Sequence, residues 1–168
     1  MEVNYIQTHK RVKETLFLKA CFNGETDVID RMIDTIDVNC VDIYGNTALM
    51  LACMVDQPWV IDVATRLIDH NIDVDKQTVM GFRALDFVFS RANFNKNLAY
   101  LISFHSKYSL GHTFQDGYTY LFSARSLESY KFLVENGANV NCIYEGRTAL
   151  DNLGHTTETK EYLLSICQ

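Results

Sequence analysis

The chain has 168 residues and a formal net charge of −6, with 48% hydrophobic and 21% charged residues. This composition is typical of a folded protein and excludes intrinsic disorder. The negative charge, with no basic block along the chain, argues against nucleic-acid binding. No apolar run approaches the roughly 18 residues of a membrane-spanning helix, and the N-terminus lacks a signal pattern. We therefore expect a cytoplasmic protein that binds neither membranes nor nucleic acids.

The negative charge is concentrated in the first half of the chain. Residues 1–84 carry 13 acidic and 8 basic residues, whereas residues 85–168 carry 8 and 7. An acidic N-terminal half is suited to a basic partner.

Four segments share one frame, in which a glycine is followed by a leucine four residues later. They are residues 42–52, 78–88, 114–124 and 144–153, and their glycines at 45, 81, 117 and 146 are separated by 36, 36 and 29 residues. A fixed period of this length indicates a repeat architecture. Each glycine permits the positive φ of a tight turn. In three segments a threonine two residues later is suited to cap a helix: Thr47, Thr119 and Thr148.

Aliphatic residues recur between these frames at helical spacing. Such stretches occur near residues 28–33, 63–68, 98–102, 130–134 and 162–164. Spacing of i, i+3 and i+4 predicts helices with one buried stripe. Asn136-Gly137 predicts a helix end with a left-handed cap.

A turn, a helix, a short break and a second helix, repeated about every 33 residues, resembles the ankyrin repeat. The most specific stretch is Gly137-Ala138-Asn139-Val140-Asn141. The resemblance implies an all-α fold, an α-solenoid of stacked helix-turn-helix pairs with short β-hairpin tips. We expect one domain over residues 1–168, with repeats at about 14–41, 42–77, 78–111 and 114–143 and a C-terminal capping repeat at 144–167.

The chain departs from the Thr-Pro-Leu-His motif of ankyrin repeats. Its proline is absent from every frame, and its histidine is replaced by Met50, Asp86, Phe122 and Asp151. Because that histidine supplies hydrogen bonds between repeats in the family, we expect looser stacking here. About three extra residues around Pro58-Trp59 lengthen one loop, where Trp59 either forms a surface feature or folds back over a helix end.

The sequence contains no recognisable arrangement of chemical groups. Its five cysteines have neither zinc-site nor disulfide-scaffold spacing, and we expect them to be buried core residues. The five histidines have no nucleophile partner, and no glycine-rich phosphate loop occurs. The acids at 27, 30, 34 and 37 predict a solvated helix face. We therefore predict no catalytic, cofactor or metal site, and a protein that is not an enzyme.

Partners of ankyrin repeats are usually held by the hairpin tips and by the concave face of the first helices. The resemblance therefore implies a protein–protein interaction module, which we expect to be a monomer with a protein partner. The implied partner-binding residues are Ile43, Tyr44, Asn46, Val79, Met80, Phe82, Tyr118, Tyr144 and Arg147 at the tips and Met54 and Arg91 on first helices. We expect Tyr44, Met80, Phe82 and Tyr118 to be the anchors. In the alternative interpretation, the tip aromatics pack sideways on neighbouring hairpins and only stabilise the array.

Three further hypotheses stay open. Degenerate repeats that are nearly free of proline are typical of viral or pathogen ankyrin proteins that act on host proteins. An inhibitor of the inhibitor-of-kappa-B kind would instead mask a basic segment of a signalling or transcription factor. An enzyme is disfavoured, since it needs a convergent pocket. Asn141 resembles a site for an asparaginyl hydroxylase, or it bonds the turn backbone.

Overall fold

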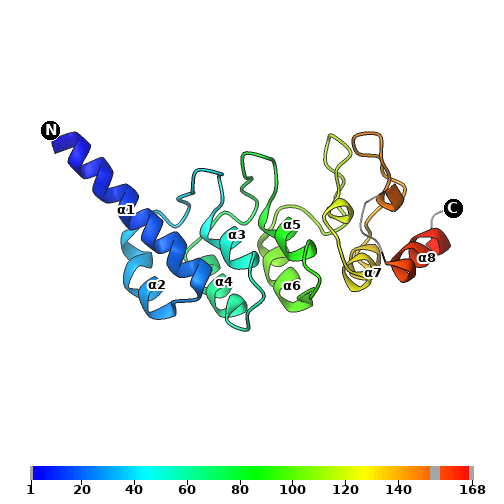
Figure 1. The fold of residues 1–168 in the computed structure, drawn as a ribbon, viewed down its shortest axis with the longest axis horizontal. Helices are drawn as coiled ribbons and strands as arrows, with labels where there is room; N and C mark the ends of the chain where they lie inside the picture. The colour runs from blue at the N-terminus through cyan, green and yellow to red at the C-terminus, as the bar shows by residue number, and fades with distance from the viewer. Residues whose placement is uncertain (1, 152–155, 167–168) are drawn as a thin grey trace. The chain divides into compact units, whose positions relative to one another are not determined.

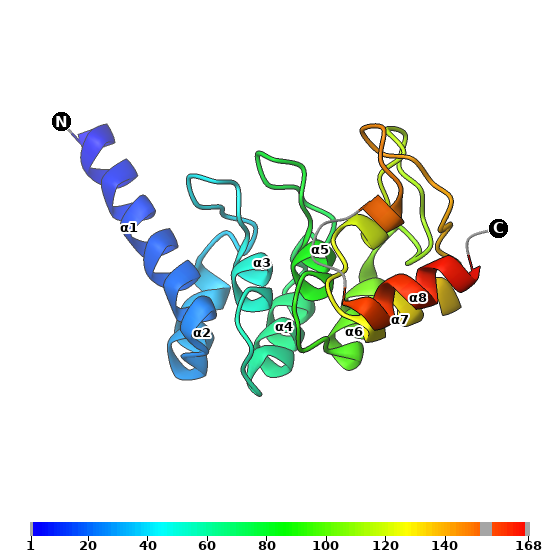
Figure 2. The same cartoon turned by 45° about the vertical axis from the view of Figure 1, so that its right-hand side comes forward.

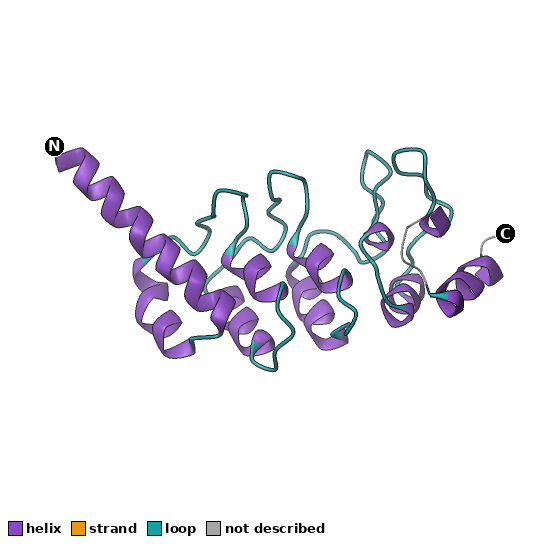
Figure 3. Ribbon diagram, viewed as in Figure 1, coloured by secondary structure: helices purple, strands orange, loops and turns teal. Residues whose placement is uncertain are grey.

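A computed structural model of the chain describes the backbone of residues 2–151 and 156–166, and side chains from residue 10 on. Every regular element in this part of the chain is a helix (Figures 1 and 3). The chain divides into two compact units, residues 1–84 and 85–168, which are described separately below. The expected all-α fold of stacked repeats is confirmed. The organisation of residues 1–168 as one domain stays a prediction.

The first unit contains two stacked helix pairs. They are α1 (Glu2–Asn23) with α2 (Thr26–Met32), which is extended by the 3-10 turn η1 (Ile33–Thr35), and α3 (Ala48–Cys53) with α4 (Val60–Asp69). Helix α1 packs against both α2 and α3, and α3 packs against α4. Helix α1 begins well before residue 14, where the sequence placed the first repeat.

A shared apolar core joins the two pairs. Phe17 of α1, Ile29 of α2, Leu49 of α3 and Leu67 of α4 are all fully buried. Helices as short as α3 are marginal on their own in water, so this burial supplies most of their stability. The buried position of Leu49 is the one that the repeat frame predicts.

The start of α3 is capped by a threonine and a methionine. The Oγ1 of Thr47 accepts a hydrogen bond from Met50 N at 3.3 Å, and Thr47 N donates to Met50 Sδ at 3.4 Å. Met50 stands where the family motif has histidine. The thioether therefore satisfies a backbone donor that would otherwise be buried without an acceptor.

The long loop before α4 covers the end of α1. The ring of Trp59 lies against Gly24, so closely that a Cβ at Gly24 would overlap it. Gly24 also has a φ of +72°, a conformation that favours glycine. Of the two interpretations of Trp59, the structure therefore supports the one in which it folds back over a helix end.

Polar side-chain contacts connect the exposed faces of the two repeats of the first unit. Arg66 Nη1 lies 2.8 Å from Asp30 Oδ1, and His70 Nε2 lies 3.3 Å from Asp34 Oδ1. Each pair joins residues one repeat apart. The side chains of Asp30 and Asp34 are 50% and 80% exposed, so the predicted solvated face is confirmed for these two acids. Exposed pairs of this kind contribute little to stability.

The boundary between the units falls after the first residue of α5 (Ala84–Phe89), and the second unit continues with α6 (Lys96–His105), η2 (Tyr120–Phe122), α7 (Leu127–Glu135), η3 (Ala149–Asp151) and α8 (Thr157–Ile166). Helix α8 packs against α7 and η3, and η2 packs against α7. The first helix of the fourth repeat is only the 3-10 turn η2, because this repeat is about three residues shorter than its predecessors. Leu121 and Ala124 are nevertheless fully buried, as their spacing predicts.

The cysteines in the described residues are buried thiols, as expected: Cys21, Cys40, Cys53 and Cys142. Burial raises the pKa of Cys21 to about 12. Burial, followed by the charges of Glu14 and Asp37, raises the pKa of Cys40 to about 11. Both thiols therefore stay protonated and unreactive at neutral pH. Cys167 lies outside the described residues.

We expect Leu49→Ala to lower the free energy of unfolding of the first unit by about 2–5 kcal/mol, because it leaves a cavity at the contact between helix pairs. Leu16→Ala, on the half-exposed side of α1, is the matched control and should cost less than about 1 kcal/mol. Urea denaturation of the full chain measures both. Equal losses for the two variants would contradict the shared core.

Candidate protein-binding surface

The first hairpin tip, residues 41–47, is held in shape by the carboxylate of Asp42. Its Oδ1 accepts hydrogen bonds from Tyr44 N and Asn46 N, each at 2.9 Å, and its Oδ2 accepts one from Asn46 Nδ2 at 2.8 Å. Val41 and Thr47 form an antiparallel bridge beneath the turn. Asn46 is consequently buried. It fixes the tip from inside and does not lie on the exposed surface where the sequence placed it.

The second tip, residues 77–83, uses a threonine for the same purpose. Thr78 Oγ1 accepts hydrogen bonds from Met80 N at 3.3 Å and Phe82 N at 3.1 Å. Thr78 N donates to Phe82 O at 2.8 Å and closes the loop. A hydroxyl and a carboxylate thus produce equivalent turns at corresponding positions.

The two tips contact each other through their backbones. Val79 N donates a hydrogen bond to Tyr44 O at 3.0 Å. A Cβ at Gly45 would lie 3.0 Å from Val79 N, so the glycine is required here for close approach as well as for its φ of +80°. Figures 1 and 2 show both loops projecting on the same side of the helices of the first unit.

Five exposed apolar side chains lie on these adjoining tips. Their exposed fractions are 86% for Ile43, 63% for Tyr44, 74% for Val79, 78% for Met80 and 37% for Phe82. We call these five residues the tip patch. A soluble protein seldom exposes neighbouring large apolar side chains unless they contact another molecule.

A second pair of exposed apolar residues lies at the ends of the first helices of this unit. Met54, which the sequence singled out, follows α3, and Phe22 is the penultimate residue of α1; both are partly exposed. Sequence reasoning missed Phe22. Aligning Ala20-Cys21 with Ala52-Cys53 would have found it, because this alignment places Phe22 opposite Met54.

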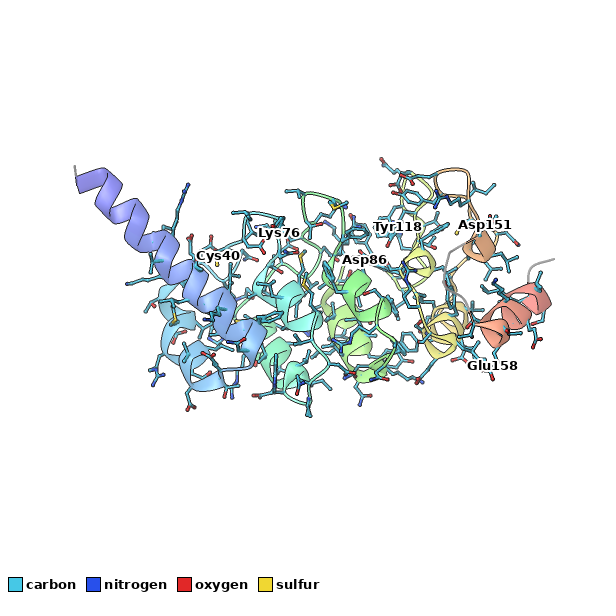
Figure 4. The ribbon with its side chains drawn as sticks, in the orientation of Figure 1. Cys40, Lys76, Asp86, Tyr118, Asp151 and Glu158 are labelled. Atoms are coloured by element: carbon cyan, nitrogen blue, oxygen red, sulfur yellow. The ribbon has the colours of Figure 1, made fainter. Side chains whose placement is uncertain are left out.

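In the second unit, Tyr118 turns inward and is part of a buried polar network. Its hydroxyl donates to Asp86 Oδ1 and lies 2.5 Å from Ser123 Oγ, which donates to the same carboxylate oxygen at 2.9 Å (Figure 4). Burial, followed by the charge of Asp86, raises the pKa of Tyr118 well above its usual range. Tyr118 therefore fits the alternative interpretation, in which tip aromatics stabilise the array.

The hydrogen bonds of Asp86 take the place of those that the motif histidine makes between repeats in the family, and the sequence did not predict them. Asp86 occupies the position of the missing histidine, yet its carboxylate accepts hydrogen bonds from Tyr118 and Ser123 of the next repeat. The expectation of looser stacking needs correction at this junction, because the aspartate connects the two repeats.

Tyr144 and Arg147 close the last tip. Each backbone N–H donates to the other residue's carbonyl, at 2.9 and 3.0 Å. The Tyr144 ring lies 5.1 Å from the Tyr118 ring and is partly buried by it, whereas Arg147 is exposed. Arg91, in the loop after α5, is half-buried.

Position relative to the turn glycine decides which tip residues are exposed in the first unit. Ile43, Tyr44, Val79 and Met80 precede their glycines and are the most exposed, whereas Asn46 and Phe82 follow theirs and are less exposed. The sequence interpretation treated both sides of the glycine alike.

Charged groups at the base of the first unit's tips are mainly acidic. Asp37 and Asp73 are exposed, and each accepts a backbone hydrogen bond from the residue two positions later. Lys76 Nζ donates to Asn39 O at 2.8 Å, and Arg83 is buried. Asp37 and Asp73 therefore present exposed negative charge on the loops that precede the two tips.

The loop at 139–141 repeats this turn with an amide. Asn139 Oδ1 accepts a hydrogen bond from Asn141 N at 3.0 Å, and Asn141 is exposed. Asn139 thus forms the same turn that Asp37 and Asp73 form in earlier repeats.

Within the described ranges, no three His, Cys, Asp or Glu side chains group in a way that could hold a metal ion. None of the helices described is both long and apolar enough to cross a membrane.

Comparison with known families supports the repeat architecture. Residues 2–78 match the model described as ankyrin repeats (3 copies). No curated protein matches the chain. The resemblance to ankyrin repeats is thereby confirmed. Such repeats are protein–protein interaction modules and typically have no catalytic activity.

We expect Tyr118→Phe to destabilise the second unit by about 1–3 kcal/mol at pH 7, because it removes a hydroxyl donor from a buried carboxylate. Tyr100→Phe, on the exposed side of α6, is the control and should cost almost nothing.

The same variant carries a pH signature. The pKa of Tyr118 is raised on folding, so its contribution is present below the unfolded value of about 10 and is lost as pH rises above it. The difference in stability between wild type and Tyr118→Phe should therefore shrink above pH 10. Chemical denaturation at pH 7 and pH 11 measures this, and a constant difference would contradict the network.

Proposed function

We propose that this ankyrin-repeat chain binds a partner protein through the tip patch of its first unit and has no catalytic activity of its own. The observation that carries the proposal is the exposure of Ile43, Tyr44, Val79 and Met80 on two tips joined by a backbone hydrogen bond. These side chains bring large apolar area to one surface at little cost in ordering the backbone.

The chemistry of the tip patch suits a protein partner. Tyrosine gives a large apolar contact with a polar end, and methionine adapts to irregular surfaces. Interface energy concentrates on a few such side chains. We infer that Tyr44 and Met80 are the anchors, and that Ile43, Val79 and Phe82 exclude water around them. Tyr118 and Asn46 are not part of this proposed site.

A second candidate function is masking of a basic segment, in the manner of an inhibitor of a signalling or transcription factor. The exposed carboxylates of Asp37 and Asp73 favour it, as does the excess of acids in residues 1–84. In this case charge, more than apolar contact, would select the partner.

We also propose that the chain acts inside a host cell as a protein of a virus or intracellular pathogen. The degenerate repeats, with one proline and nine tyrosines in the chain, support this proposal. Host proteins would then supply the partner.

We expect Tyr44→Ala with Met80→Ala to abolish partner capture while leaving the thermal midpoint within about 2 °C of wild type, because both side chains are exposed. Affinity capture from cell lysate, read by mass spectrometry, identifies proteins retained by wild type and lost by this variant. Direct titration with the purified candidate then confirms binding. Leu164→Ala, exposed on α8, is the control and should retain the partner; equal capture by all three proteins would reject the tip patch.

Salt dependence separates the two candidate functions. If the tip patch dominates, affinity for the captured partner should change less than about threefold between 50 and 500 mM NaCl, since apolar contacts are not screened. Masking of a basic segment predicts a steep loss. The variant Asp37→Asn with Asp73→Asn should abolish that loss, and asparagine keeps the turn as Asn139 does. The ionic-strength series with both proteins measures this.

A further inference from the structure

Helix α1 differs in charge from the rest of the first unit. Residues 10–23 contain four basic residues and one acid, whereas residues 1–84 as a whole contain 13 acids and 8 bases. The helix packs against α2 and α3, and its Phe17 and Cys21 are fully buried. Figures 1 and 2 show the first half of α1 extending past α2 and α3. The side of α1 opposite the two buried residues is therefore open to another molecule.

Two aliphatic residues and a lysine form the middle of this open side. At 3.6 residues per turn, Val12, Leu16 and Lys19 lie within about 60° of one another around the helix axis and roughly opposite Phe17 and Cys21. Val12 and Leu16 are each more than half exposed, and Lys19 is exposed. Two apolar side chains thus adjoin a cation one turn further along the helix.

Two further cations flank this apolar contact. Arg11 and Lys13 lie on either side of Val12 around the helix and are exposed. Among the side chains that the structure describes, none forms an ion pair with Arg11, Lys13 or Lys19. We call Arg11, Val12, Lys13, Leu16 and Lys19 the outward face of α1.

No carboxylate belongs to the outward face. Glu14, the one acid in residues 10–23, lies on the same side of the helix as the buried Phe17 and Cys21. Its side chain is only 20% exposed, and Lys10 Nζ lies 3.7 Å from its Oε1. The positive charge of the outward face is therefore not balanced within α1, and it adjoins exposed apolar area.

We propose that the outward face of α1 binds an acidic amphipathic helix of a partner protein. Apolar residues of that helix, spaced three and four apart, pack on Val12 and Leu16. Its carboxylates pair with Arg11, Lys13 and Lys19. Residues 11–19 span about 12 Å along the axis of α1, which little more than two turns of a partner helix cover.

A broad anionic surface, such as a bilayer, is disfavoured as the occupant. It would meet the excess of acids in the first unit, among them the exposed Asp27 and Asp30 of the adjoining α2. A single helix lying along α1 contacts the cations without these acids. At physiological ionic strength, charges more than about 8 Å away are largely screened.

A synthetic acidic helix tests this directly. The probe is an acetylated, amidated peptide of two copies of Glu-Leu-Ala-Glu-Leu-Ala-Glu, whose leucines lie on one side of a helix. It is titrated into the full ¹⁵N-labelled chain and followed by backbone amide shifts. We expect saturable shifts centred on residues 10–23. Two control peptides, one with lysine for each glutamate and one with the same composition in scrambled order, should bind at least about tenfold more weakly.

Matched charge variants separate the outward face from the charge of the whole unit. Arg11→Gln with Lys19→Gln should weaken binding of the acidic peptide at least about fivefold. Lys10→Gln with Arg31→Gln removes the same charge elsewhere and should change binding less than about twofold. All four side chains are exposed, so thermal midpoints should stay within about 2 °C of wild type.

A third variant tests the apolar contact and keeps every charge. Val12→Ala with Leu16→Ala should also weaken binding of the acidic peptide at least about fivefold, because the leucines of the peptide lose their contact. Binding at the wild-type affinity would contradict an amphipathic occupant.

Other outcomes would also overturn the proposal: absence of saturable shifts, shifts centred outside α1, equal binding of either control peptide, or equal losses for the two charge variants. Co-sedimentation with vesicles of phosphatidylserine and phosphatidylcholine, lost in the Arg11 and Lys19 variant, would assign the face to a membrane instead. The tip-patch variant Tyr44→Ala with Met80→Ala should bind the acidic peptide as wild type does, so this test is independent of the proposed function.

Discussion

Close approach of successive repeats is the constraint on which the rest of the structure depends. Helices as short as α3 have too small a core of their own, and in the first unit the two helix pairs bury their apolar residues against each other. At the tips the backbones themselves come into contact, as Gly45 does with Val79 in the first unit and Gly117 does with Ile143 in the second. A side chain at either glycine would separate the repeats.

Where the family motif has histidine, other side chains form the hydrogen bonds of these repeats. Met50 caps its own helix through sulfur, and Asp151 accepts hydrogen bonds from both the N–H and the hydroxyl of Thr148. Asp86 instead reaches the following repeat through Tyr118 and Ser123. The same sequence position thus satisfies local groups in two repeats and joins two repeats in a third.

The sequence predicted the parts of the fold that depend on periodicity. Glycines and leucines in a fixed frame indicated turns followed by buried helices, and Leu49 and Leu121 lie where that frame places them. It could not predict which tip residues face solvent, because Asn46 and Tyr118 turn inward to satisfy Asp42 and Asp86, and those contacts form only in the folded chain. The outward face of α1 was missed for a different reason, since the repeat pattern began at residue 14 and the helix begins well before it.

The hydrogen bond from Val79 N to Tyr44 O has a consequence for recognition. Because the Asp42 and Thr78 side chains also hold the turns, the neighbouring loops are already organised before any encounter. A ligand then meets a surface of fixed spacing and loses affinity if its own contacts are spaced differently. Selectivity at these loops would thus come from geometric match rather than from adaptation on contact.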